Sequence, residues 1–205
     1  MKLKLLLALV FTFTICKAQL KPVLITLKNG EELKGIGKRK AYTFKYKADD
    51  NAKPQEFEFS TIKSVEIELS ENNITIYKCY QTKESDRFIL VAEIISGNKA
   101  ELFSTSFTYN SGFSGGMGTG GMGTGGIGIG MGMGGGSVTH YYVKKTNEDR
   151  LTDLGEYNPL INNLKAKVKD YFSDCKSLIE KLENREFKVR EGLEDIVNYY
   201  NNNCE

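Results

Sequence analysis

The sequence predicts an α+β protein in which an antiparallel β meander, or a small β barrel, precedes a bundle of about three short helices. Between residues 23 and 109, apolar residues recur mostly at every second position, as in strands with one buried face. From Asn158 the period changes to 3.6, as in amphipathic helices. We therefore expect a β domain over residues 19–149 and a helical module over residues 150–205.

Turn-forming segments divide the β domain into strands. Residues 23–27 alternate and then meet Asn29-Gly30, which favours a tight hairpin turn. Residues 42–46 alternate in the same way and end at the polar loop DDNAKP. The pattern continues through residues 57–69 and through Ile74 and Ile76. Further strands are expected at residues 87–95, 99–109 and 138–145.

Three helices are expected in the C-terminal module. Asn158 and Pro159 favour a helix start, because proline suits the first helical position. Ser173 is expected to cap a second helix. The third helix should contain Gly192, which costs about 1 kcal/mol relative to alanine inside a helix. Its apolar stripe consists of Val189, Leu193, Val197 and Tyr200.

The first eighteen residues have the order of a secretory signal peptide. Lys2 and Lys4 precede an apolar run over residues 5–15, and cleavage is expected between Ala18 and Gln19. A lipoprotein alternative, with Cys16 acylated, is disfavoured. That processing requires small or aliphatic residues just before the cysteine, and here Phe13-Thr14-Ile15 precede it. A membrane-spanning helix needs about 20 apolar residues. We therefore expect an exported protein, periplasmic or extracellular, without an integral membrane span.

Removal of the signal peptide makes the chain nearly neutral. The full chain has 28 lysines and arginines against 26 acids, and three of these lysines lie within residues 1–18. The remaining lysines are interleaved with acids, as on an ordinary solvated surface. Nucleic acid is therefore not expected as a partner.

Three cysteines remain after cleavage, in a compartment where disulfides form. Cys175 and Cys204 both lie on apolar helix stripes, so the two are expected to form a disulfide. The alternative is that they are two unpaired small apolar residues. Cys79 lies in the strand segment ITIYKCYQ and is expected to be the buried, unpaired cysteine.

Three segments resemble two known groups of proteins. The segment TLKNGEELKGIG resembles the opening hairpin of small SH3-like and Sm-like barrels, which implies a fold and no ligand. At the C-terminal end, Tyr171, Phe172, Asp174 and Cys175, followed by Tyr200, Asn201 and Cys204, resemble a pattern in secreted Bacteroidota proteins of unknown function. The segment YYVKKTNED at residues 141–149 is similar to the same group.

A glycine-rich segment separates two expected strands. Fourteen of the 22 residues from 115 to 136 are glycine, and none is charged. Because glycine loses the most backbone entropy on folding, we expect a disordered loop over residues 111–137. Gly116, Gly118 and Gly121 match a dinucleotide motif by spacing, but no helix follows. The segment is too weakly apolar for a membrane hairpin, and its methionines lack the histidine or cysteine partners typical of a Cu(I) site.

No arrangement of residues in the sequence indicates catalysis, a metal or a cofactor. His140 is the only histidine, and no nucleophile motif accompanies it. Asp49-Asp50 lies in a polar loop, and the aromatic residues at 42–46 and 57–59 alternate as core residues do. We therefore expect a non-catalytic cell-envelope protein that binds another envelope protein or a surface component. The alternatives are a periplasmic carrier of a small apolar ligand and an enzyme with an unrecognised carboxylate site.

Overall fold

The computed structural model describes residues 20–71, 73–110, 135–156 and 163–204. The strands are β1 (Lys21–Leu27), β2 (Glu32–Arg39), β3 (Thr43–Lys47), β4 (Gln55–Glu58), β5 (Ile62–Ser70), β6 (Asn73–Thr82), β7 (Ser85–Ile95), β8 (Ala100–Asn110), β9 (Gly135–Lys145) and β10 (Thr152–Glu156). The helical elements are α2 (Asn163–Tyr171), α3 (Lys176–Glu183), the 3₁₀ turn η1 (Val189–Glu191) and α4 (Glu194–Asn203).

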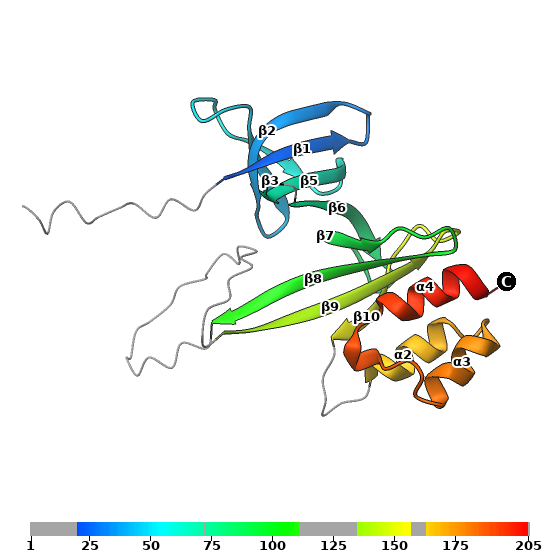
Figure 1. The fold of residues 1–205 in the computed structure, drawn as a ribbon. Coiled ribbons are helices and arrows are strands. Elements are labelled where there is room, and N and C mark those ends of the chain that lie inside the picture. Colours follow the sequence, from blue (N-terminus) through cyan, green and yellow to red (C-terminus); the bar gives the residue numbers. More distant parts are fainter. Residues whose placement is uncertain (1–19, 72, 111–134, 157–162, 205) are drawn as a thin grey trace, which may run out of the picture.

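The described strands form one antiparallel sheet in the order β10-β9-β8-β7-β6-β5-β1-β2-β3-β4, with the helices at one end (Figure 1). The predicted α+β class is confirmed. Of the two architectures expected from the sequence, the meander is the one observed, because the sheet is open.

Several expectations fall outside the described residues or differ from the structure. The predicted signal peptide, its cleavage site at Ala18-Gln19 and the helix start at Asn158 lie outside the described residues, as do residues 111–134 of the glycine-rich segment. Residues 135–137 belong to strand β9 rather than to a loop, and pair with the end of β8. Strand β10 lies within the segment 150–205 that was expected to be helical.

The first half of the sheet buries its own core. Ile25, Phe44, Ile62 and Leu90 are fully buried in one cluster that draws on β1, β3, β5, β6 and β7. The helices lie at the other end of the sheet (Figure 1), so strand curvature closes this core. Gly30 provides the positive φ (89°) of the β1–β2 turn.

Strand β7 belongs to two cores because its side chains alternate between faces. Leu90 points into the first core, whereas Val91 points to the opposite face, where it packs with Phe103, Tyr142 and Leu151. We call this opposite face, which is turned away from the helices, the far face. The part of this face around Val91 is enclosed because the β6–β7 turn bends over it.

Backbone hydrogen bonds hold that bend in place. Leu151 N donates to Gln81 O at 2.9 Å, and Lys83 N donates to Leu151 O at 2.8 Å. A parallel bridge between Thr82 and Leu151 lies between these bonds. Strands β6 to β10 therefore curl until the β6–β7 turn meets the segment before β10.

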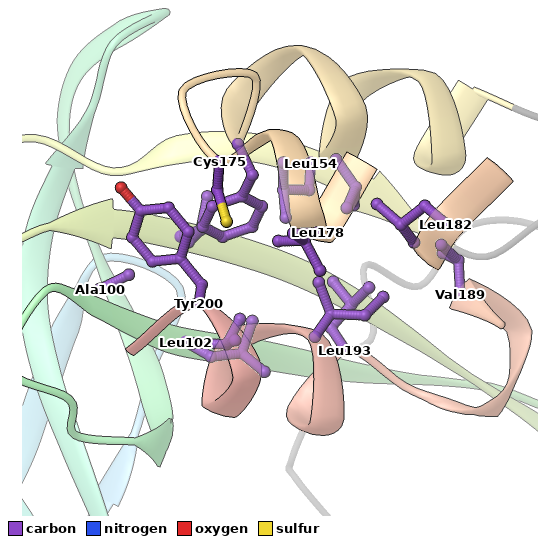
Figure 2. Packing of buried hydrophobic residues seen from close by; sticks show 14 of the residues in the cluster. Ala100, Leu102, Leu154, Cys175, Leu178, Leu182, Val189, Leu193 and Tyr200 are labelled. Atoms are coloured by element: carbon purple, nitrogen blue, oxygen red, sulfur yellow. The ribbon is translucent and has the colours of Figure 1, made fainter. Parts of the chain in front are cut away.

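The helices cover the other face of β8, β9 and β10. Figure 2 shows Leu102 and Leu154 of the sheet packed in one cluster with Leu178 of α3 and Leu193 before α4. All four side chains are almost fully buried. Burial of one sheet face by amphipathic helices is the expected arrangement for this fold class.

Two predicted details of the helices are wrong. Gly192 does not lie inside a helix: its φ of 125° separates η1 from α4, so the expected third helix is two short elements. Only glycine adopts such a backbone without strain. The residue before α3 is Cys175 rather than Ser173, and its side chain makes no capping hydrogen bond.

Asn201 joins α4 to the turn between β7 and β8. Its Oδ1 accepts hydrogen bonds from Lys99 N at 2.9 Å and Ala100 N at 2.8 Å, while its Nδ2 donates to Ala100 O at 2.9 Å. The amide therefore pairs with the start of β8 as a neighbouring strand would. Gly97 makes room for it, because a Cβ there would lie 2.1 Å from Asn201 Nδ2.

A second junction combines a disulfide with a charged network. Cys175 and Cys204 are joined by a disulfide, with Cα atoms 5.4 Å apart. Beside it, Asp174 accepts hydrogen bonds at 2.7 Å from Lys145 Nζ on β9 and from the Tyr200 hydroxyl on α4. Burial opposes ionisation of Asp174, but these two bonds outweigh it and lower its pKa.

The hydroxyl of Tyr171 extends the same network. It donates to Glu148 Oε2 at 2.5 Å and accepts from Lys145 N at 2.7 Å. Most residues that carry the C-terminal resemblance therefore lie at the contact between helices and sheet. Their arrangement assigns them a structural role in this chain.

Replacing both Cys175 and Cys204 by alanine should lower the free energy of unfolding by about 3 to 4 kcal/mol, because the cross-link no longer restricts the unfolded chain. Urea unfolding of the oxidised protein and of the double variant measures this difference. A reducing agent should destabilise only the protein with both cysteines. A difference below about 1 kcal/mol would contradict the prediction.

Asn201→Ala should cost about 3 kcal/mol of stability, because it leaves two backbone N–H groups and one carbonyl without partners at a buried site. The matched control is Asn202→Ala on the next residue, which is exposed and donates only within its own helix. That change should stay within about 0.5 kcal/mol of the parent protein in urea unfolding. Equal effects at both positions would show that Asn201 does not support the β7–β8 turn.

Candidate functional site

A cleft of about 660 Å³ lies beside β5 and β6. Lys78 and Tyr80 line it from the far face, whereas Cys79 and Phe88 line it from the side of the first core. Five segments line it: the β1–β2 turn, β5, β6, β7 and the loop before β10. Its charged lining residues are Lys28, Lys63, Lys78, Glu93 and Asp149. We call it the lysine cleft.

Strand β6 supplies a continuous row of side chains to this surface. Ile74, Ile76, Lys78 and Tyr80 alternate with inward-facing residues, so they share the far face. Ile74 is 59% exposed and Ile76 is 42% exposed, whereas the neighbouring inward residues Tyr77 and Cys79 are buried. The row, which we call the β6 strip, runs from an exposed apolar end into the lysine cleft, where Ile76, Lys78 and Tyr80 form part of the wall.

Two lysines and two glutamates meet at the inner end of the cleft. Lys78 Nζ lies 2.6 Å from Glu93 Oε2 and 3.4 Å from Glu101 Oε1, and Lys144 Nζ lies 3.1 Å from Glu101 Oε2. Lys144 is buried, and the side chains of Glu93 and Glu101 are only 13% and 14% exposed. Glu101 Oε2 receives no hydrogen bond from a described residue, so its contact with Lys144 is electrostatic. We call these four residues the ionic quartet.

Aromatic rings flank the ionic quartet. Tyr80 and Phe103 meet edge to face, with centroids 5.3 Å apart, and Lys144 Nζ lies 5.6 Å from the Tyr80 centroid. Burial alone would lower the pKa of Lys78, but the ion pair with Glu93 and the charge of Glu101 outweigh it and raise the pKa. Burial, and then the charge of Glu101, raises the pKa of Tyr80, so its hydroxyl stays a hydrogen-bond donor at neutral pH.

The quartet brings two carboxylates together, as an enzyme with an unrecognised acidic site would require. Each carboxylate, however, already lies against a lysine, and the four charges sum to zero. The arrangement is that of a balanced ion-pair network that fixes the shape of the cleft.

His140 has an acidic partner that the sequence did not indicate. Its Nε2 lies 2.6 Å from Asp153 Oδ1 on β10, and its ring stacks on Tyr142 with centroids 4.9 Å apart. Burial opposes ionisation of Asp153, but the bond to His140 outweighs it and lowers its pKa. In the described part of the chain, no hydroxyl is hydrogen-bonded to His140.

The remaining candidates from the sequence have structural roles. Asp49 accepts backbone hydrogen bonds from Asn51 at 2.7 Å and Ala52 at 2.8 Å, so it stabilises a loop turn. Burial raises the pKa of Cys79 to about 12, which keeps this unpaired thiol protonated and unreactive. Phe44, Tyr46 and Phe59 lie in the core, whereas Tyr42 is exposed. Within the residues the structure describes, no group of three or more acids, histidines or cysteines could hold a metal ion.

The chain was compared with protein-family models, with curated proteins and with solved structures. It matches none of them. Within the described ranges, every helix is too short or too polar to span a membrane. Function must therefore be inferred from the geometry of the site.

Lys78→Met should lower the free energy of unfolding by about 2 kcal/mol, because it leaves Glu93 without a partner at a mostly buried position. The effect is smaller than for a fully buried pair, since the Lys78 side chain is 26% exposed. Lys40→Met is the control, because the Lys40–Glu56 pair is exposed and the change should leave stability unaltered. Urea unfolding at neutral pH measures both, and equal effects would contradict the prediction.

Proposed function

We propose that this chain is an exported, non-catalytic protein that binds another envelope protein or a surface component through the far face of β5 and β6. The observation that carries the proposal is the exposure of Ile74 and Ile76 on a regular strand, directly beside the lysine cleft. Export rests on the signal-peptide pattern of residues 1–18.

The exposed isoleucines supply binding energy to a partner. Covering the exposed part of each side chain is worth about 1 kcal/mol, so the pair offers about 2 kcal/mol. The cleft next to them can receive one side chain of the partner as an anchor. Anchor side chains that fill pockets carry much of the binding energy in protein interfaces.

An apolar carrier is supported less well. Such a carrier encloses its ligand in a pocket lined by aromatic side chains. Here Phe44, Ile62 and Leu90 are fully buried against their neighbours and fill the first core. The lysine cleft is instead open and has five charged residues in its lining, which favours binding at the surface over enclosure.

A photoreactive amino acid at position 66 tests this function in the native envelope. Glu66 is paired with Ile76 across β5 and β6, so a partner covering the isoleucines lies within reach. Illumination of living cells should yield a defined cross-linked product. A photoreactive residue at position 42, which is also exposed but lies at the β2–β3 turn, should not yield that product.

Ile74→Lys combined with Ile76→Lys should lower the yield of the cross-linked product from position 66 at least tenfold, because about 2 kcal/mol of apolar contact is lost. Tyr42→Lys removes an exposed aromatic residue elsewhere and should leave the yield unchanged. Both variants change exposed positions, so urea unfolding should show the parent stability. A yield unaffected by the isoleucine changes would exclude this surface as the binding site.

A further inference from the structure

The lysine cleft holds hydrogen-bond donors that lack acceptors. Among the described residues, none forms a hydrogen bond or an ion pair with the side chains of Lys28, Lys63, Ser64 or Tyr80, although all four line the cleft. Lys78, the third lysine of the lining, differs from these residues because it is paired with Glu93 and Glu101. The free groups are two ammonium groups and two hydroxyls, all of which can donate.

The charges of the lining leave an excess of one positive charge. Lys28, Lys63 and Lys78 face Glu93 and Asp149, which is three positive charges against two negative. Lys78 and Glu93 already neutralise each other, so the excess belongs to Lys28 and Lys63. A ligand with one negative charge would balance the cleft, whereas a dianion would add repulsion from the two acids.

Apolar groups stand next to these donors. Lys28 Nζ lies 4.1 Å from the centroid of the Phe88 ring, so its charge is held over an aromatic face at the edge of the cleft. Ile76 and Phe88 both line the cavity. A volume of about 660 Å³ lies within the range of pockets that hold small ligands or single side chains.

We infer that the lysine cleft binds a single carboxylate carried by an apolar group of the partner, with Lys28, Lys63 and the Tyr80 hydroxyl as its donors. The inference rests on the proposed function, because it names the chemistry that the docked partner presents. The carboxylate belongs either to a chain terminus or to an acidic side chain next to an apolar residue. In both cases the apolar part lies against Ile76.

Short peptides test this inference on the mature chain, residues 19–205. The probes are acetyl-Leu-Phe with a free carboxylate and the same peptide with a C-terminal amide, titrated by two-dimensional NMR. The free acid should bind at least five times more tightly and shift the Ile76 methyl signal. Equal binding of acid and amide, or no binding of either, would overturn the inference.

Variants of the cleft lysines connect the binding to the named donors. Lys28→Gln with Lys63→Gln should reduce the preference for the acid to less than twofold, while Lys53→Gln in the exposed β3–β4 loop should keep it. A preference retained in the double variant would overturn the assignment of these donors. The NMR spectrum of each variant reports whether it is folded.

The two sources of the carboxylate give different results with a third probe. Acetyl-Leu-Glu with a C-terminal amide should match the free acid if the partner presents an acidic side chain, and should bind as weakly as the neutral amide if it presents a chain terminus. If the peptides fail while cross-linking from position 66 still depends on Ile74 and Ile76, the carboxylate inference falls and the proposed function stands. If that cross-linking fails as well, both fall.

Discussion

Two backbone hydrogen bonds at Leu151 set the geometry on which the far face depends. They tie the β6–β7 turn to the segment before β10, although four other strand pairings separate β6 from β10 in the sheet. This contact encloses Val91, Phe103, Tyr142 and Leu151, and it brings Asp149 to the mouth of the lysine cleft. Without it, the ionic quartet would lie on an open sheet, where water would weaken its ion pairs.

Strand β7 shows how one sheet serves three packed regions. Its alternate side chains enter the first core and the far-face cluster, and its C-terminal end packs on the helical core through Ile94 and Ile95. Asn201 fixes the turn that follows β7, while the disulfide and Asp174 hold the helices against the sheet. The helical layer therefore stabilises the face opposite the proposed binding surface and leaves the β6 strip exposed.

Local periodicity predicted most of the elements, because strands and helices impose periods of 2 and 3.6 on buried positions. Periodicity could not show which face of each strand is buried. Ile74 and Ile76 continue the alternation that marks the core strands, yet the buried face of β6 is that of Tyr77 and Cys79. Alternation shows that two faces differ, but long-range packing decides which of them is covered.

The candidate site could not be predicted from the sequence either, because long-range packing brings its residues together. The ionic quartet draws its four residues from four strands, so no local spacing marks it. Strand β10 was missed because it is short and contains Gly155 with a φ of 87°, which interrupts the pattern. The cysteine pair could be predicted because Cys175 and Cys204, at the start of α3 and the end of α4, continue apolar stripes whose buried side can be read from the sequence.

Amide hydrogen exchange at Leu151 and Lys83 is the most direct measurement of the curvature that forms the site. If these two N–H groups hold the β6–β7 turn over the far face, they should exchange as slowly as the amides of the central strands. Exchange as fast as in an exposed loop would show that the turn is not fastened there. The lysine cleft and the ionic quartet would then lose their structural basis.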